Sequence, residues 1–138
     1  MPTLEKPRIL VVDDNEDWQK TVRGMLKDEG YDVAIAGTFE DAHALLISQS
    51  FNLAVIDMRL DDPDEENIDG ITLARIIHKK WPHIQTVIIT GFDTPGTVDE
   101  AMKPSSEGRL VHDYILKKDA NELLLPTIQR LLSESVNS

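Results

Sequence analysis

The sequence predicts an α/β protein in which a five-stranded parallel sheet is wound on both faces by five helices. Five short apolar runs alternate along the chain with segments whose apolar residues recur at steps of three or four, the patterns of buried strands and amphipathic helices. Several of the short runs are apolar on both alternating sides, which is typical of parallel strands covered by helices on each face. Alternating strands and helices with right-handed crossovers form a doubly wound fold.

The first half of the chain contains two predicted strands and two predicted helices. Arg8–Val12 is a continuous apolar run, as expected for a central parallel strand. The helix that follows has apolar residues at helical spacing from Trp18 onward and ends at Gly30, because glycine readily closes a helix. Asp32–Ala36 is the second strand. Thr38 is a suitable N-cap for the second helix.

In the middle of the chain a buried strand is followed by an acidic loop. The strand Asn52–Asp57 is apolar on both alternating sides until its last residue. The stretch Asp61–Glu66 is too acidic, and too interrupted by proline, for regular structure. A helix around residues 71–77 should stop before Pro82, because a residue that precedes proline is disfavoured in the α region.

The last third supplies two more strands and two more helices. Gln85–Thr90 and Leu110–Leu116 are the apolar runs that predict strands. Thr97–Lys103 predicts a short helix, and the final helix runs to Leu131. Proline inside a helix removes a hydrogen bond and clashes with the preceding turn, so Pro126 should bend or interrupt this helix.

Composition limits the classes of function. The length of 138 residues fits one domain, with a core expected over about residues 8–132. The net charge of −11 argues against direct binding to nucleic acid or anionic membranes, and the lack of cysteine excludes thiol chemistry. No apolar run approaches the roughly 18 residues of a membrane span, and the N-terminus lacks the apolar core of a signal peptide. We therefore expect a cytoplasmic protein without membrane insertion.

Reactive side chains follow four of the five predicted strands. The first strand leads into Asp13 and Asp14, the third ends in Asp57, the fourth ends in Thr90, and the fifth is followed by Lys117. In an open parallel sheet, ligands bind outside the carboxyl ends of the strands. Clustered carboxylates raise each other's pKa unless a cation neutralises them, and oxygen ligands suit Mg²⁺ or Mn²⁺. The sequence predicts a divalent metal site at this edge.

Such a site can support phosphoryl transfer. A carboxylate such as Asp57 can act as a nucleophile toward phosphorus, and the reaction needs mainly positioning and charge stabilisation, which Lys117 and Thr90 could supply. Taken singly, each of these residues is more often a cap, a turn residue or a surface charge. Their joint occurrence at the ends of separate strands favours a common functional pocket.

The sequence resembles the receiver domains of two-component response regulators. These domains share the flavodoxin-like fold of the bacterial chemotaxis regulator, with strand order 2-1-3-4-5. The resemblance extends from Arg8 to about Leu132. The segments that match the family pattern in order are Ile9–Asp14, Leu53–Asp57, Asp69–Gly70, Val87–Thr90 and Asp113–Lys117.

The resemblance implies that Asp57 accepts a phosphoryl group from the phosphohistidine of a sensor kinase or phosphotransfer protein. Asp14, Asp57 and the backbone carbonyl of Arg59 would bind Mg²⁺ directly, and Asp13 would help through water. Lys117 would pair with the phosphate. On this reading the protein is not an enzyme toward other molecules, because it catalyses only its own phosphorylation and dephosphorylation.

The resemblance also implies a conformational switch. Thr90 would move toward the phosphoryl oxygens, and Tyr114 would rotate inward to fill the space that it leaves. The surface formed by the fourth helix, the fifth strand and the fifth helix would then exchange its downstream protein partners. The sequence names neither the kinase nor these partners, nor the oligomeric state.

The sequence departs from the family pattern at three places. Lys118 stands where the family usually has a proline joined by a cis peptide; because a cis bond before another residue costs about 3 kcal/mol, we predict a trans peptide between Lys117 and Lys118. The loop from Asp57 to Gly70 is longer than usual and acidic. Pro104–Arg109 looks like an insertion beside the expected signalling surface.

Two other functions stay open. A receiver-like scaffold would bind partners without phosphorylation, although every residue of the acidic site is present. A phosphatase with an aspartate nucleophile, of the haloacid-dehalogenase type, would need a second aspartate two residues after Asp57, where Arg59 stands. Nucleotide binding is disfavoured, because the sequence has neither a Walker phosphate loop nor a GxGxxG turn.

Overall fold

A five-stranded parallel sheet forms the centre of the computed structural model, which describes residues 6–57, 69–90 and 112–137. The strand order is β2-β1-β3-β4-β5, so the predicted flavodoxin-like topology is confirmed. The strands are β1 (Arg8–Val12), β2 (Asp32–Ala36), β3 (Leu53–Asp57), β4 (Gln85–Thr90) and β5 (Asp113–Leu116).

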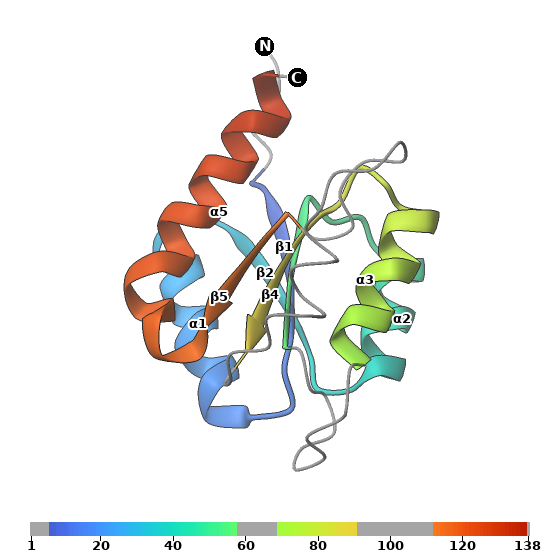
Figure 1. Ribbon diagram of the computed structural model, residues 1–138, viewed down its shortest axis with the longest axis horizontal. Coiled ribbons are helices and arrows are strands. Elements are labelled where there is room, and N and C mark those ends of the chain that lie inside the picture. Colours follow the sequence, from blue (N-terminus) through green and yellow to red (C-terminus); the bar gives the residue numbers. More distant parts are fainter. Residues whose placement is uncertain (1–5, 58–68, 91–111, 138) are drawn as a thin grey trace.

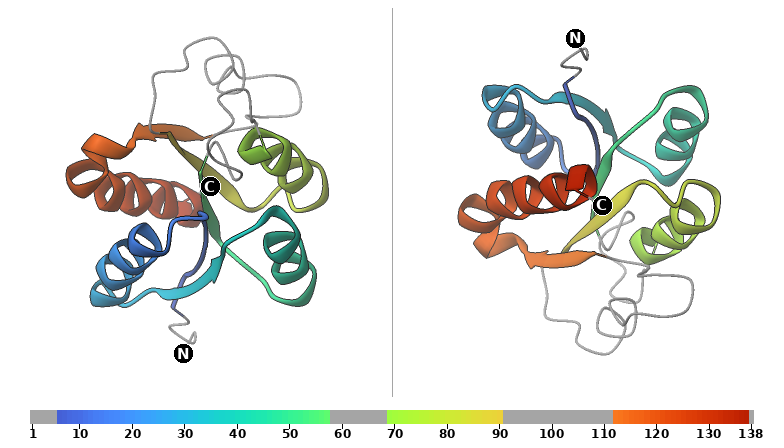
Figure 2. Two further views of the ribbon diagram at one scale, coloured as in Figure 1. Left: turned by 90° about the horizontal axis from the view of Figure 1, so that it is seen from below. Right: turned by 90° about the horizontal axis from the view of Figure 1, so that it is seen from above.

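Helices cover both faces of this sheet. The α-helices that the structure describes are α1 (Glu16–Asp28), α2 (Phe39–Ser48), α3 (Asp69–Lys80) and α5 (Ala120–Asn137), and a 3₁₀ turn, η1 (Lys117–Asp119), precedes α5. Figure 1 shows α1 and α5 on one face and α2 and α3 on the other, and the end-on views of Figure 2 show the same two layers. The helix predicted at 97–103, the acidic loop 61–66 and the segment 104–109 lie outside the described residues.

Each face of the sheet carries its own apolar layer, because successive residues of a strand point to opposite sides. In β1, Leu10 and Val12 pack with residues of α2 and α3. Ile9 and Val11 pack instead with residues of α1 and α5. We call these two sides the α2/α3 face and the α1/α5 face. The same alternation determines on which face each residue at the ends of the strands lies.

The C-terminus of α1 is closed by a Schellman motif. The Gly30 N–H donates to the Lys27 carbonyl at 2.9 Å, and the Tyr31 N–H donates to the Leu26 carbonyl at 3.2 Å. Gly30 has φ +90°, a left-handed conformation that costs a residue with a side chain about 1–2 kcal/mol. The predicted glycine stop is therefore confirmed, and its cause is this backbone conformation.

We expect Gly30→Ala to lower the free energy of unfolding by about 1–2 kcal/mol, since alanine is strained at positive φ. The control is Gly24→Ala inside α1, where an added Cβ meets no atom within 4 Å. That substitution should raise the free energy of unfolding by about 0.5–1 kcal/mol, because alanine favours helix. Urea denaturation measures both. Two changes of the same sign would contradict this account of the helix end.

Two sequence predictions need correction. The fifth strand was expected from Leu110, but β5 begins at Asp113, and His112 precedes it outside the strand. Pro126 does not interrupt the last helix, because α5 continues through it to Asn137. Pro126 lies on the exposed side of α5, so the carbonyl that loses its hydrogen bond belongs to exposed Glu122. The buried side chains on the opposite side of α5, such as Leu124, hold the helix against the sheet.

Candidate functional site

The register of the two central strands brings Asp13 and Asp57 together. β1 and β3 pair with Val12 opposite Ile56, so Asp13 and Asp57 stand at the same level, one strand spacing of about 4.8 Å apart. Their exposed fractions are only 1% and 7%. Both alternate with residues of the α2/α3 face and therefore belong to the α1/α5 face.

A short turn after β1 holds Asp13 in place. The Asp13 N–H donates to the Ala36 carbonyl at 3.0 Å, the Asp13 Oδ1 accepts the Asn15 N–H at 2.9 Å, and the Gln19 side-chain amide donates to the Asp13 carbonyl. Asn15, and not an aspartate, caps α1. Asp13 and Asp14 are therefore not explained as helix caps, the common structural role for such a pair.

Asp14 completes a group of three carboxylates. Asp13, Asp14 and Asp57 each offer one oxygen, and these oxygens lie within 4.8 Å of one another. Asp14 is exposed, whereas the other two are buried. The cluster is therefore open to solvent on one side, as a site that receives an ion or a substrate must be.

Lys117 reaches this cluster from the end of β5, the edge strand of the sheet. Its Nζ lies 3.3 Å from Asp13 Oδ2 and 3.6 Å from Asp57 Oδ2. Lys117 follows β5 directly, two residues after Ile115, which packs on the α1/α5 face. The same alternation therefore places the lysine and both buried aspartates on one face. The predicted meeting of these three residues is found.

The environment raises the pKa of both Asp13 and Lys117. For Asp13, burial disfavours the charged form more strongly than the Asn15 N–H and the Lys117 ammonium favour it, so its pKa is raised. For Lys117, burial alone would lower the pKa, but the attraction of Asp57 and Asp13 together outweighs it, and the pKa is raised. Lys117 is therefore positively charged at neutral pH.

The residues present fit a hard divalent cation. Three carboxylates against one ammonium leave two negative charges in excess among the described residues. The Asp13 Oδ2 is buried, and no described residue gives it a hydrogen bond of good geometry, although the Lys117 Nζ lies beside it as an ion pair. A buried oxygen in this situation is costly. An oxygen-ligated Mg²⁺ would relieve both the excess charge and the unsatisfied oxygen.

The three other predicted site residues are not part of this cluster of described side chains. Arg59 lies outside the described residues. The backbone of Thr90 ends β4 and pairs with Leu116 of β5, so it reaches the same edge of the sheet as Asp57. Tyr114 is half-buried and packs on the α2/α3 face, the face opposite to that of Lys117.

Two residues that support the site are not predicted from the sequence. Gln19 was not singled out, although it holds the Asp13 carbonyl. Trp18 was assigned only to the apolar side of a helix, yet the Lys117 Nζ lies 5.7 Å from the centroid of its ring. No local signal identifies such a contact, because it joins the first helix to the end of the fifth strand.

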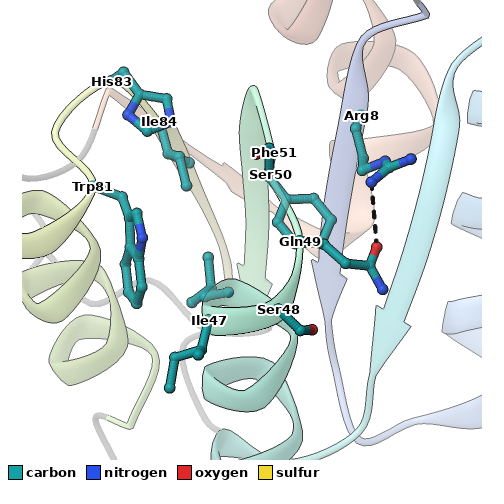
Figure 3. A pocket seen from close by; sticks show the side chains of 10 residues that line it. Arg8, Ile47, Ser48, Gln49, Ser50, Phe51, Trp81, His83 and Ile84 are labelled. Carbon is teal, nitrogen blue, oxygen red and sulfur yellow. Dashed lines mark hydrogen bonds between the residues drawn. The ribbon is translucent and has the colours of Figure 1, made fainter.

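Two cavities among the described residues lie at the other end of the sheet. One of about 390 Å³ is lined by Arg8, Phe51 and Trp81 among others, and Figure 3 shows these side chains around it. A second of about 440 Å³ shares Arg8 and Phe51. These residues precede or begin strands, so both cavities are far from the carboxylates at the strand ends.

The sheet order and the cluster of carboxylates with a lysine define a doubly wound α/β domain with a polar site at the carboxyl ends of its strands. Comparison with known proteins gives the family: residues 9–129 match the response regulator receiver domain, and the chain belongs to this family. A CheY-like receiver domain from Methanospirillum hungatei is 28% identical with a TM-score of 0.83, and the match covers 96% of this chain and 98% of that one.

Longer regulators contain similar segments. The alginate biosynthesis transcriptional regulatory protein AlgB of Pseudomonas aeruginosa is 36% identical over 116 residues, which are 83% of this chain and 24% of AlgB. The nitrogen assimilation regulatory protein NtrX of Azorhizobium caulinodans is 31% identical over 124 residues, 90% of this chain and 26% of NtrX. The chain thus spans about a quarter of the length of these curated relatives.

Proposed function

We propose that this chain is a phosphoacceptor, in which Asp57 takes a phosphoryl group from the phosphohistidine of a sensor kinase or phosphotransfer protein. We also propose that residues 1–138 form a single receiver domain, with its core at about residues 8–132. The observation that carries the proposal is the position of the Lys117 Nζ, within 3.6 Å of both Asp57 and its neighbour Asp13. A buried carboxylate beside a fixed cation is suited to attack an anionic phosphoryl group.

The proposed step exchanges one bond to phosphorus for another. An Asp57 carboxylate oxygen attacks phosphorus, the new O–P bond forms, and the P–N bond to histidine breaks. The imidazole leaves with its electron pair and takes up a proton from solvent. Lys117 stabilises the negative oxygens of the transferring group, which is the main requirement of such reactions. Hydrolysis of the aspartyl phosphate returns Asp57, so the chain acts only on itself.

The proposal includes Mg²⁺, or Mn²⁺ in its place. Asp14 and Asp57 would hold the ion with the backbone carbonyl of Arg59, and Asp13 would assist through water. Bound there, the ion supplies charge neutralisation for the phosphoryl oxygens. The chain's own contribution is the fixed carboxylate cluster, which the turn after β1 and the end of β3 hold in register.

We propose Thr90 and Tyr114 as the switch. Thr90 ends β4 next to β5, and its hydroxyl would approach the phosphoryl oxygens. Tyr114 belongs to β5, which pairs with β4, so movement at the end of β4 is passed directly to its strand. The surface formed by the predicted helix at 97–103, β5 and α5 would then change its affinity for a downstream protein partner, without direct contact to nucleic acid.

A cytoplasmic location fits this proposal, because kinase phosphohistidines and Mg²⁺ are both available there. None of the helices in the described segments is both long and apolar enough to cross a membrane. Fractionation of cells that express the chain tests the proposed location.

Incubation with a small-molecule phosphodonor and Mg²⁺, followed by intact mass measurement, tests the phosphoacceptor role. We expect the wild type to gain one phosphoryl group, and Asp57→Asn to gain none, because an amide is no nucleophile at this centre. Asp41→Asn, at the exposed start of α2, is the control and should be phosphorylated like the wild type. A wild type that takes no phosphoryl group would support the scaffold function instead.

A further inference from the structure

Lys117 has a third neighbour that the proposed chemistry does not use. Besides its two carboxylate partners, its Nζ lies over the ring of Trp18, 5.7 Å from the ring centroid. This distance is within the roughly 6 Å at which an aromatic face attracts a cation. Trp18 is half-buried and packs against the apolar layer of the α1/α5 face, so its ring is held by the core and not by the lysine.

We propose that Trp18 is a positioning residue for Lys117, whose indole face keeps the ammonium group beside Asp13 and Asp57. Lysine has a long, flexible side chain, and in this protein 31% of it is exposed. Keeping such a side chain in the site costs rotamer freedom. The Trp18 ring limits the rotamers that the Lys117 side chain can adopt and adds an attraction of its own. Its effect on phosphoryl uptake rests on the proposed function, whereas the contact itself does not.

The ring differs in kind from the two carboxylates. Asp13 and Asp57 change their partners when a metal ion or a phosphoryl group arrives, so their attraction for Lys117 changes too. The indole carries no charge, is not phosphorylated and does not bind a hard cation. Its attraction for the ammonium group therefore does not depend on whether a metal ion or a phosphoryl group is bound. The Lys117 side chain then already lies in the site when a phosphoryl group arrives.

The turn after β1 places Trp18 and Asp13 as one unit. The Asp13 Oδ1 accepts the Asn15 N–H, and the Asn15 Oδ1 accepts the Trp18 N–H at 2.9 Å. Two consecutive hydrogen bonds thus link the backbone of the tryptophan to the carboxylate. β1 and α1 hold the two ends of this turn, and both the carboxylate and the ring contact Lys117.

A double-mutant cycle tests the contact without phosphorylation. Trp18→Leu and Lys117→Met are combined singly and together, and unfolding is measured in urea. We expect a coupling of about two- to fivefold in the unfolding constant. The matched control is Trp81→Leu with the same Lys117→Met. Trp81, the other of the two tryptophans, is half-buried on the α2/α3 face, and we expect no coupling there.

A second readout uses the folded wild type. Protons above an aromatic ring are shifted upfield, so the ε-methylene resonances of Lys117 should lie upfield in the NMR spectrum of the wild type and of Trp81→Leu. They should move toward their ordinary position in Trp18→Leu, and lie between the two in Trp18→Phe. This measurement keeps the test decisive where Trp18→Leu does not fold, because the wild type and Trp18→Phe suffice. An ordinary shift in the wild type would overturn the inference.

Phosphoryl uptake completes the test. We expect Trp18→Leu to slow uptake from a small-molecule phosphodonor about two- to fivefold, with partial recovery in Trp18→Phe, because phenylalanine keeps a weaker aromatic face. Trp81→Leu should react at the wild-type rate. Equal rates in both leucine variants, with no coupling in the cycle, would overturn the positioning role. Coupling in a protein whose wild type takes no phosphoryl group would refute the proposed function and leave this inference standing.

Discussion

Lys117→Met should slow phosphoryl uptake by about 100-fold or more, the usual loss when one group that stabilises developing charge is removed. Methionine keeps much of the length of lysine but carries no charge. The Lys117 ammonium is the described cation that contacts both Asp13 and Asp57, so its loss removes this fixed positive charge from beside the transferring group. The rate of mass increase with a small-molecule phosphodonor and Mg²⁺ measures this effect.

The same substitution should lower the free energy of unfolding by about 1–2 kcal/mol at pH 7 without metal. Breaking a fully buried ion pair costs more, but the partly exposed lysine makes this pair weaker. The pKa of Lys117 is raised on folding, so its stabilising effect is complete below the ordinary lysine pKa and is lost as the pH rises through the folded value. At pH 7 the whole effect is therefore present.

Lys118→Met is the control for Lys117→Met. It removes the same charge from the next residue, whose side chain is exposed. We expect uptake at the wild-type rate and a change in the free energy of unfolding within about 0.5 kcal/mol. Similar losses in both variants would show that net charge, and not the contact with Asp13 and Asp57, determines the result.

Asp13→Asn should stabilise the metal-free protein at pH 7, by about 1–2 kcal/mol, since burial of an ionised carboxylate is costly. The pKa of Asp13 is raised by burial above its ordinary value. The favourable contribution of this group is therefore present below pH 3.8, its ordinary value, and is lost as the pH rises through the folded pKa. Asparagine removes this loss, so stability should fall less between acid and neutral pH. Urea denaturation at several pH values measures the difference.

Magnesium should reverse this order of stability. A ligand that binds only the folded state stabilises it, and Asp13 belongs to the three carboxylates that fit the ion. We expect Mg²⁺ to raise the melting temperature of the wild type clearly and that of Asp13→Asn only weakly. Asp28→Asn, a control at the exposed end of α1, should respond to Mg²⁺ like the wild type. An equal response of all three proteins would refute a metal site at this cluster.

Much of the fold follows from local sequence patterns. Each of the five strands was predicted from a short apolar run, and Gln85–Thr90 agrees with β4 at both ends. One N-cap was also readable: Thr38 accepts the Asp41 N–H at 3.0 Å, as expected of a helix N-cap, whereas Asn15 at the start of α1 was not predicted. Differences occurred where context outside the local pattern decides, as at Pro126, which is exposed and does not interrupt α5. The trans peptide between Lys117 and Lys118 stays a prediction.

The residues of the candidate site were found from the sequence because of one general rule. Carboxyl ends of parallel strands meet at one edge of the sheet, so Asp13, Asp57 and Lys117 could be expected there once their strands were recognised. The rule gives the edge, but not the distances. Contacts of 3.3 and 3.6 Å to Lys117 depend on the register of β1 with β3 and on the reach of a side chain from the far strand.

The sequence by itself determined the alternating strands and helices, the N-cap Thr38, the helix stop at Gly30 and the set of reactive residues at the strand ends, because these depend on neighbours along the chain. Only the tertiary structure decided which groups share a face. It placed Lys117 with Trp18 on the α1/α5 face and Tyr114 on the α2/α3 face. The physical reason is that such contacts depend on strand register and on helix packing, which join residues far apart in the sequence.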